Sequence, residues 1–321
     1  MKAGRAGFRC ARVQALAKIN LDLRVLGKRP DGYHELRTIF QTISLADRLE
    51  IGFAPGRRTA IEIEDPLRIP DNLAGKAAES ALDALSIGGH VSIRLAKRIP
   101  MGAGLGGGSS DAAAVLLALP VLTGRALPLP KLCELGAVLG SDVPFFLLGG
   151  TAVGIGRGTE LFPLPDGPRR VGLLVAPRVQ VSTAEAYRRL SPRLTVELQD
   201  STIFSFQSLV WDRGVPPDNP CNDFEAVVFE QHRQLAELKK RLARTGASPV
   251  LMSGSGSAIF GLFRGRDAAR DALGAGKNPL SNERVFLFSL VSRARYRSQW
   301  WRALKEHIDQ RTWPPQSRYA R

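Results

Sequence analysis

The chain has 321 residues, with 45 lysines and arginines against 30 acidic residues and a formal net charge of +15. Its length favours two domains over one, and its 44% hydrophobic and 23% charged residues are typical of a globular protein and not of a disordered one. No apolar run reaches the roughly 18 residues that cross a bilayer, and the basic N-terminus lacks the apolar segment of a secretory signal. The three cysteines lie far apart in the sequence, which fits a reducing cytoplasm.

The excess charge is concentrated at the two ends of the chain. Residues 1–12 carry four basic side chains and no acid, whereas residues 291–321 carry eight basic and two acidic ones. Basic runs attract phosphate backbones, so a nucleic-acid-binding protein is one alternative. Residues 291–321 nevertheless show no heptads, zinc motif or ribonucleoprotein motif.

Strand-like and helix-like patterns alternate through both halves, which predicts an α+β fold. Alternation of apolar and polar residues, or short apolar runs, predict strands over residues 15–26, 49–53, 90–97, 171–176 and 284–291. Helices are expected at residues 73–85, 110–119, 130–139 and 222–245; the last is expected to be the longest, and Pro120 is expected to stop the second.

A proline-rich stretch, residues 161–170, is the best candidate domain boundary. We therefore expect one domain over residues 1–160, a second over residues 161–291, and a basic C-terminal extension over residues 292–321. The extension contains Trp300, Trp301, Leu304 and Ile308, whose spacing indicates a short amphipathic segment that could dock on the body; a surface tail is the alternative.

The strongest local signal is a glycine-rich run between an expected strand and an apolar helix. Without Cβ atoms, the backbone N–H groups of such a run can converge on an anion, and the following helix directs its N-terminal amides at the same point. Two serines at the end of the run add hydroxyls that could bond phosphate oxygens or a metal bound to them. The predicted phosphate-binding loop consists of Pro100, Met101, Gly102, Ala103, Gly104, Leu105, Gly106, Gly107, Gly108, Ser109 and Ser110.

Other interpretations of this run are weaker. A Walker loop would end in Gly-Lys-Ser/Thr, and no lysine follows these glycines. Gly102, Gly104 and Gly107 match the dinucleotide pattern, but the acid expected about 20 residues further on is missing from residues 126–130. A structural turn without a ligand would leave the backbone entropy of five glycines uncompensated.

Residues 100–110 resemble the second motif of the GHMP kinases, a family of small-molecule kinases that includes galactokinase, homoserine kinase and mevalonate kinase. Residues 17–21 (AKINL), 27–36 (GKRPDGYHEL) and 139–146 (LGSDVPFF) resemble the branch of this family that acts on a cytidine diphosphate-linked methylerythritol. Together with a second glycine-rich turn, residues 253–257 (SGSGS), these motifs stand in family order over most of the chain.

The resemblance implies the two-domain architecture of this family, with the active site in the inter-domain cleft. It also implies ATP-dependent phosphorylation of the 2-hydroxyl of the substrate, in the non-mevalonate isoprenoid pathway. Mg²⁺ is implied with ATP because phosphoryl transfer requires neutralisation of the phosphate charge. The resemblance gives no protein ligand for the metal, and Asp111, where relatives can carry asparagine, is not assigned.

The resemblance places the catalytic base on Asp142 and a catalytic lysine on Lys18. The base would take the proton of the attacking hydroxyl, and the lysine would favour the ionised carboxylate. A capping or Asx-turn aspartate is the alternative for Asp142. Lys18 and Asn20, a candidate substrate-binding residue, share one strand face, for which a solvated face is the alternative. Where relatives usually have proline before Ala-Lys, this chain has Leu16.

Tyr33 and His34 follow a Pro-Asp-Gly turn, and the resemblance assigns them to the cytosine end of the substrate, by stacking and hydrogen bonds. Tyr187 is a candidate second wall of that pocket. Surface aromatic residues are the alternative for all three. Gly254 and Ser255, in the second glycine-rich turn, are expected near the substrate phosphates, with a hairpin-like turn as the alternative.

Asn72 is expected both to cap the helix of residues 73–85 and to lie near the adenine of ATP. The four histidines show no ligand spacing, so no zinc site is predicted. The expected partner is the small-molecule substrate, and binding to a specific nucleic acid or to a membrane is not expected. The chain is expected to be a monomer or a weak homodimer. A mevalonate-type or homoserine kinase is the rival within the family, against which residues 30–34 (PDGYH) speak.

Overall fold

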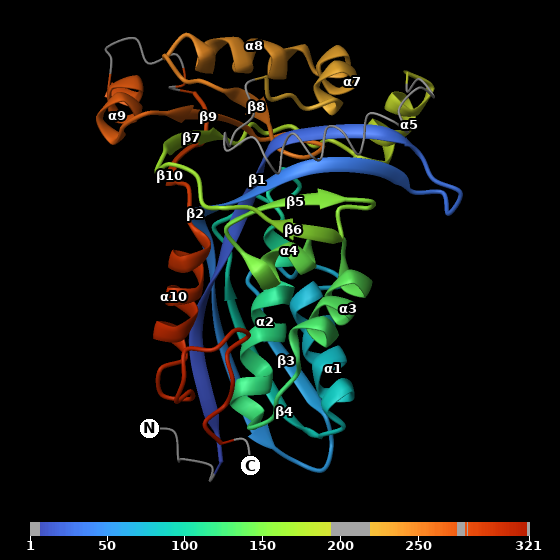
Figure 1. The fold of residues 1–321 in the computed structure, drawn as a ribbon, viewed down its shortest axis with the longest axis vertical. Coiled ribbons are helices and arrows are strands. Elements are labelled where there is room, and N and C mark those ends of the chain that lie inside the picture. Colours follow the sequence, from blue (N-terminus) through green and yellow to red (C-terminus); the bar gives the residue numbers. More distant parts are fainter. Residues whose placement is uncertain (1–6, 194–218, 275–279, 281, 320–321) are drawn as a thin grey trace.

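The structure, a computed structural model, describes residues 7–193, 219–274, 280 and 282–319. Lys2, Arg5 and Arg321, which contribute to the terminal charge, lie outside the described residues. Two sheets, one above the other in Figure 1, organise the molecule. The mixture of strands and helices confirms the predicted α+β class.

The first sheet has six strands, in the order β3-β4-β2-β5-β6 with β1 paired along β2. Its strands are β1 (Arg9–Lys28), β2 (His34–Pro55), β3 (Ala60–Glu64), β4 (Gly89–Ala96), β5 (Thr151–Ile155) and β6 (Glu160–Pro163). The helices packed against it are α1 (Leu73–Leu85), α2 (Gly107–Thr123), α3 (Leu129–Leu139) and α4 (Val143–Leu148). Because α2 is apolar on every side, it runs through the middle of this core, covered by the sheet and its neighbouring helices.

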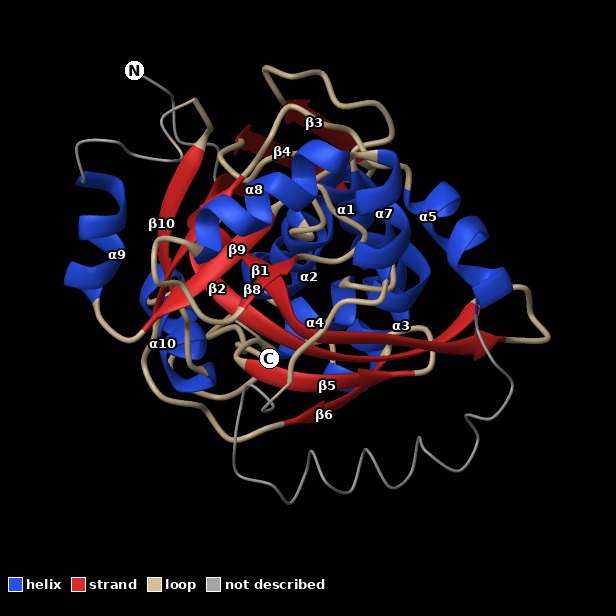
Figure 2. Ribbon diagram, turned by 90° about the horizontal axis from the view of Figure 1, so that it is seen from above, coloured by secondary structure: helices blue, strands red, loops and turns tan. Residues whose placement is uncertain are grey.

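The second sheet has four strands in the order β10-β7-β9-β8. Its strands are β7 (Val171–Val175), β8 (Val250–Met252), β9 (Ile259–Phe263) and β10 (Val285–Ser289). The helices of this half are α5 (Thr183–Leu190), followed by a 3₁₀ turn (Ser191–Arg193), α7 (Phe224–Gln231), α8 (Arg233–Ala243) and α9 (Arg266–Gly274). Figure 2 shows α8 and α9 beside this sheet and α5 at the far end of the long β1–β2 ribbon.

Strand β1 connects the two halves. Its Ile19 and Leu21 pack in one apolar cluster with Leu174 and Phe260 of the second sheet. Burying each of these apolar side chains stabilises the fold by about 1.5–3 kcal/mol. Lys18 stands on the opposite face of β1, in a cavity that Asp142 of the first half and Gly254 of the second also line.

Residues 164–170 connect β6 to β7 and so join the two sheets. They lie within the proline-rich stretch, residues 161–170, that the sequence indicates as a boundary, and residues 161–163 of that stretch belong to β6. The domain limits 1–160 and 161–291 stay predictions. None of the helices in the described part of the chain is long and apolar enough to cross a membrane.

Two expectations for helix limits are wrong. Helix α2 continues past Pro120 to Thr123, because the buried Val121 and Leu122 pack its last turn into the core. The helix expected over residues 222–245 is two helices, since His232 leaves the helical region between α7 and α8. The break lets α8 turn its Leu235, Leu238 and Leu242 onto the second sheet, and α2 is the longest of the described helices.

The C-terminal extension docks on the body. Helix α10 (Arg293–Ala303) runs along the flank of the long strands in Figure 1, and Trp300, Leu304 and Ile308 are buried in the core of the first half. The Tyr296 hydroxyl donates a hydrogen bond to the carbonyl of Phe146, and the Trp313 indole N–H donates to the carbonyl of Leu147 at 2.9 Å. The extension thus satisfies carbonyls at the end of α4, the helix that Asp142 precedes.

Trp300→Ala is expected to lower the free energy of unfolding by about 3–5 kcal/mol, because it leaves a cavity under α10. Urea denaturation of the purified variant measures this. Val138→Ala is the control, since that side chain is 88% exposed, and it should change stability by less than about 0.5 kcal/mol. Equal stability of the two variants would show that the extension is not part of the core.

Candidate active site

Lys18 and Asp142 form an ion pair in the cleft between the two halves. Lys18 Nζ lies 3.3 Å from Asp142 Oδ2, with the lysine buried and the carboxylate 28% exposed. Asp142 stands immediately before α4, yet its side chain makes no capping hydrogen bond. The capping interpretation therefore fails, and the carboxylate is free to accept a proton from a hydroxyl in the cleft.

A chain of hydrogen bonds fixes the lysine. Lys18 Nζ donates to Asn20 Oδ1 at 2.8 Å, and Asn20 Nδ2 donates to Thr38 Oγ1 at 2.7 Å. The Thr38 hydroxyl in turn donates to the Asp22 carbonyl. The polar face of β1 is thus buried and internally bonded, and the solvated-face interpretation of Lys18 and Asn20 is wrong.

The two glycine-rich turns pack against each other beside this pair. Gly104 has φ +75°, and a Cβ there would overlap the carbonyl oxygen of Ser253. The Ser253 hydroxyl donates to the Gly104 carbonyl at 2.9 Å, and the Lys18 amide donates to the Leu105 carbonyl at 3.0 Å. Helix α2 begins from Gly106, so its N-terminal amides face the same cleft.

The predicted loop residues contribute in different ways. Ala103 and Leu105 bury their side chains in the core, so only their backbones are available to a phosphate. Ser110 is also buried, and its hydroxyl donates to the Leu16 carbonyl at 2.7 Å. This hydroxyl thus donates its proton inside the protein, and its contact with phosphate or metal stays a proposal, while Ser109 is half-buried.

Asn72 caps α1 as expected: its Oδ1 accepts from the Ala74 amide at 3.0 Å, and its Nδ2 donates to Asp65. Leu73, the next residue, lies against Gly108 at the start of α2. Asn72 thus stands beside the glycine-rich loop, although it does not line the cavity around Lys18. Its contact with adenine stays a proposal.

A buried cluster of three charged residues holds the start of the glycine-rich loop in place. The sequence does not reveal this cluster. Lys97 Nζ lies 2.5 Å from Asp47 Oδ2 and 2.7 Å from Asp111 Oδ2. Asp47 Oδ1 also accepts from the amides of Arg98 and Ile99. The cluster thus fixes the entry to residues 100–110 and the first turn of α2, while Asp111 Oδ1 is buried without a hydrogen-bond partner among the described residues.

Burial raises the pKa of Asp111 to about 7, against the opposing charge of Lys97 and with a further raising effect from Asp47. A carboxyl whose folded-state pKa lies above its unfolded value stabilises the fold less as pH rises from about 4 to about 7. Asp111→Asn removes this titration. We expect the unfolding free energy of the wild type to fall more between about pH 5 and about pH 8 than that of Asp111→Asn, as measured by urea denaturation. Parallel pH profiles would contradict this.

Tyr33, His34 and Tyr187 line a cavity of about 680 Å³ at the far end of the β1–β2 ribbon. The rings of His34 and Tyr187 stack at 4.6 Å, and the guanidinium of Arg157 lies 3.6 Å from the centre of the Tyr33 ring. Burial, with the nearby charge of Lys28, lowers the pKa of His34, so the ring is neutral at pH 7. Its Nε2 lies 2.6 Å from the Ser191 hydroxyl.

This cavity adjoins a smaller one, of about 230 Å³, around Lys18 and Asp142. The two share several lining residues, among them Arg157, Thr183 and Tyr187. Of the predicted site residues, the smaller cavity brings together Lys18, Asn20, Gly104, Gly106, Asp142, Tyr187, Gly254 and Ser255. Burial and the Asp142 charge raise the pKa of Tyr187 to about 12, which keeps its hydroxyl protonated.

Two polar residues of these cavities are not anticipated from the sequence. Arg157 stands in the Gly-Ile-Gly-Arg-Gly turn between β5 and β6. This turn is a third glycine-rich segment, and a single arginine among its glycines is the sequence signal that could have indicated a binding residue. Thr183 begins α5, and its hydroxyl lies 2.7 Å from that of Ser255. In the described part of the chain, no group of three or more His, Cys, Asp or Glu side chains is placed to hold a metal ion.

A lysine–carboxylate pair in a cleft, beside a glycine-rich loop and a helix N-terminus, suits a small-molecule kinase, and family comparison agrees. Residues 72–150 match the GHMP kinases N terminal domain and residues 217–282 match the GHMP kinases C terminal domain. The chain belongs to the GHMP kinases. Within that family it belongs to the 4-diphosphocytidyl-2-C-methyl-D-erythritol kinases, as its identity to the relatives described next shows. It is an enzyme of the ATP-dependent kinase class.

A curated relative from Solibacter usitatus with that name is 63% identical over 315 residues, 97% of this chain and 98% of the relative. One from a Geobacillus species, with the same name, is 43% identical over 78% of this chain and 88% of its own length. A crystal structure of 4-(cytidine 5'-diphospho)-2C-methyl-D-erythritol kinase is 40% identical, with a TM-score of 0.71 over 87% of this chain and 98% of its own. A homoserine kinase from Cytophaga hutchinsonii, 20% identical with a TM-score of 0.65, shares the fold.

Proposed function

We propose that this chain transfers the γ-phosphate of ATP to the 2-hydroxyl of 4-diphosphocytidyl-2-C-methyl-D-erythritol, a step of the non-mevalonate isoprenoid pathway. The observation that carries this proposal is the continuity of two cavities, one with the Lys18–Asp142 pair and the other with the Tyr33, His34 and Tyr187 rings. A substrate with a hydroxyl at one end and a base at the other fits such a path. The substrate named for the relatives has both.

Asp142 is the general base of the proposed reaction. Its carboxylate takes the proton of the substrate hydroxyl, whose oxygen forms the new bond to the γ-phosphorus while the bond to the β–γ bridging oxygen breaks and ADP leaves. Lys18, whose Nζ lies 3.3 Å from Asp142 Oδ2, pairs with the carboxylate and holds it in place. The lysine itself is held by Asn20 and so has one fixed position.

The glycine-rich loop and the start of α2 are proposed to bind the triphosphate of ATP. Gly102, Gly104 and Gly106 all have positive φ, a backbone conformation that glycine adopts readily, and the α2 dipole favours negative charge at this point. We propose that ATP carries Mg²⁺, which would neutralise the phosphate charge. Mg²⁺ in such sites is held by phosphates and one or two protein oxygens, so the absence of a three-ligand cluster among the described residues fits this arrangement.

The base of the substrate is proposed to occupy the larger cavity. Arg157 and the neutral His34 offer hydrogen-bond groups beside aromatic faces, which suits a cytosine ring. We propose that the chain acts as a monomer or weak homodimer, without a specific nucleic acid or a membrane partner. No disulfide joins the three cysteines, which supports a reducing compartment such as the cytoplasm.

A comparison of two substrates with two enzymes tests the cytosine pocket. Tyr33→Ala should lower kcat/KM for the full substrate by about tenfold or more, because a base–aromatic stack is worth about 1–3 kcal/mol. The same variant should leave kcat/KM unchanged for a substrate that lacks the cytosine. Steady-state ATP consumption measures both. An equal loss of kcat/KM with the two substrates would show that Tyr33 does not contact the base. Equal kcat/KM of the wild-type enzyme for the two substrates would contradict the proposed substrate.

A further inference from the structure

An arginine-lined cavity of about 690 Å³ lies apart from the active site. Its walls come from the connection between β6 and β7, the β9–α9 turn and the start of α10. It shares no lining residue with the cavities around Lys18 and Tyr33. Its volume falls within the roughly 300–1,000 Å³ that small-molecule sites occupy.

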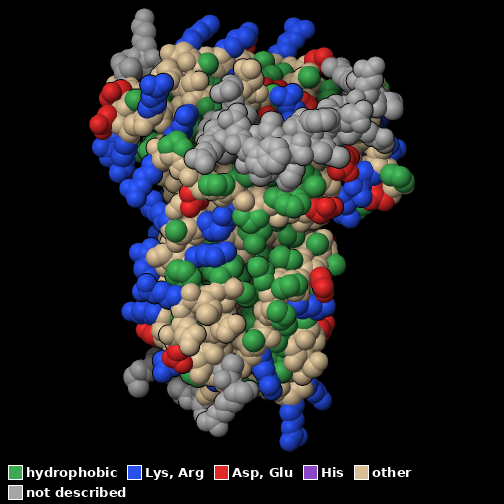
Figure 3. Space-filling view, viewed as in Figure 1, with side chains coloured by type: hydrophobic (Ala, Val, Ile, Leu, Met, Phe, Trp, Pro, Cys, Tyr) green, Lys and Arg blue, Asp and Glu red, His purple; other side chains and the backbone are tan. Residues whose placement is uncertain are grey.

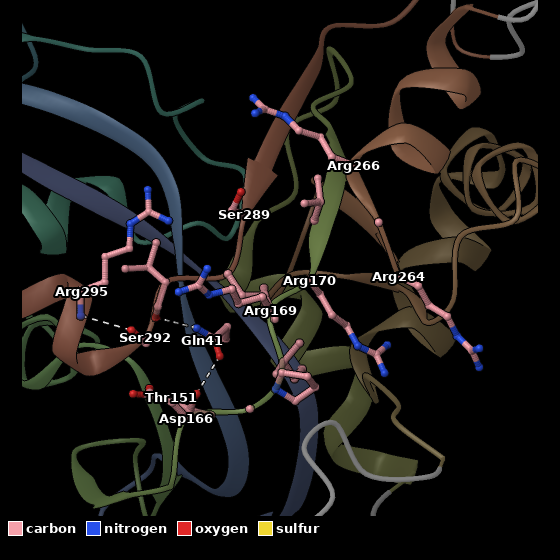
Figure 4. A pocket seen from close by; sticks show the side chains of 17 residues that line it. Gln41, Thr151, Asp166, Arg169, Arg170, Arg264, Arg266, Ser289, Ser292 and Arg295 are labelled. Carbon is pink, nitrogen blue, oxygen red and sulfur yellow. Dashed lines mark hydrogen bonds between the residues drawn. The ribbon is translucent and has the colours of Figure 1, made fainter.

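The charge of this cavity is strongly unbalanced. Five arginines line it from separate segments, against one carboxylate, that of Asp166. Figure 4 shows them around the cavity: Arg169 and Arg170 from the connection, Arg264 and Arg266 from the β9–α9 turn, and Arg295 from α10. Among the described residues, neither Arg169, Arg264, Arg266 nor Arg295 forms a side-chain ion pair or hydrogen bond.

The backbone segments that form the floor of the cavity are joined to one another by hydrogen bonds. Gln41, buried, donates from Nε2 to the Val291 carbonyl at 3.1 Å, and its Oε1 accepts from the Thr151 hydroxyl at 2.7 Å. The Leu290 amide donates to the Arg170 carbonyl at 3.0 Å, so the two crossing segments are bonded to each other. The fold therefore places five arginines around one cavity, in which Asp166 supplies the single carboxylate.

The wider surface has the same sign. Figure 3 shows lysine and arginine side chains along the flank of the molecule that α9 and α10 form. Such a flank attracts anions over a distance set by the ionic strength, and the cavity is the concave part of it.

We propose that this cavity is a binding site for a small polyphosphate anion, distinct from the ATP site. Guanidinium groups bind phosphate oxygens through paired N–H donors, and the excess of positive charge matches a ligand with several negative charges. The bound anion would bridge arginines of the second sheet to arginines of the connection and of α10. It would thereby hold together the segments that join the two halves of the enzyme.

Calorimetric titration with sodium tripolyphosphate tests the proposal. The full chain is first saturated with a non-hydrolysable ATP analogue, so that the active site is filled. One tripolyphosphate should bind per chain at about 0.05 M salt. Arg169→Ala/Arg264→Ala should weaken binding by about tenfold or more, since each arginine supplies a charge-assisted contact, without changing the affinity for the analogue.

The matched control is Arg57→Ala/Arg58→Ala, which removes two exposed arginines from the β2–β3 connection and should leave the affinity within about twofold. Inorganic diphosphate and ADP are compared next: equal affinity assigns the site to phosphate groups alone, and tighter ADP binding that the cavity variant abolishes assigns it to a nucleotide. No heat with the analogue bound, equal affinity in the two double variants, or tighter binding of a DNA oligonucleotide would overturn the proposal.

Discussion

Asp142→Asn is expected to lower kcat by a factor of about 10²–10⁴, the range that a general base contributes, while the Kd for ATP stays within about twofold. Asparagine keeps the shape of the side chain but cannot accept the proton of the hydroxyl. The carboxylate makes no capping bond whose loss would disturb α4, so the effect should be on turnover and not on folding. Single-turnover phosphoryl transfer separates the chemical step from product release.

Asp271→Asn is the matched control, because it makes the same chemical change on the exposed face of α9. Its kcat should equal that of the wild type. Turnover near the wild-type level in Asp142→Asn would remove Asp142 from the role of base. A parallel loss of ATP affinity would indicate that the carboxylate serves binding instead.

Gly104→Ala is expected to weaken ATP binding by more than tenfold, for two reasons that act together. Its φ of +75° disfavours any side chain by about 1 kcal/mol, and its Cβ would overlap the carbonyl of Ser253, which is backbone and cannot rotate away. The two glycine-rich turns would have to separate, which moves the loop relative to Lys18. Equilibrium titration with ATP measures the change.

Gly102→Ala is the control that carries the cost of a positive φ without the steric overlap, so the difference between the two variants measures the steric part. Gly102 also has a positive φ, of +63°, but no atom lies within 4 Å of the Cβ that alanine would add. This variant should lose only about 1 kcal/mol of stability and keep most of its ATP affinity. Equal losses of ATP affinity in the two variants would show that contact between the two turns is unimportant.

Local features of the fold could be predicted from the sequence because their causes are local. The helix at residues 73–85 and its Asn72 cap follow from a capping residue before an Ala/Leu-rich run, and the structure has both. The glycine-rich run likewise carries its own signal, since the positive φ of Gly102, Gly104 and Gly106 is what glycine permits.

Features that depend on tertiary contacts could not be predicted in this way. The alternation in β1 places Lys18 and Asn20 on one face, but the burial of this face depends on residues distant in the sequence, such as Asp142. The cluster of Lys97, Asp47 and Asp111 joins residues up to 64 positions apart. The five arginines of the cavity apart from the active site are likewise scattered along the sequence. They line one cavity only because the fold brings their three segments together.

The most direct test of the proposed function is the specificity of the purified chain across a substrate panel. Initial rates of ATP consumption are measured with 4-diphosphocytidyl-2-C-methyl-D-erythritol, mevalonate and homoserine, and the phosphorylated product is identified by phosphorus NMR. We predict a kcat/KM for the cytidine diphosphate substrate at least about 10²-fold above either of the others, with the new phosphate on the 2-hydroxyl. A comparable or higher kcat/KM with mevalonate or homoserine would contradict the account.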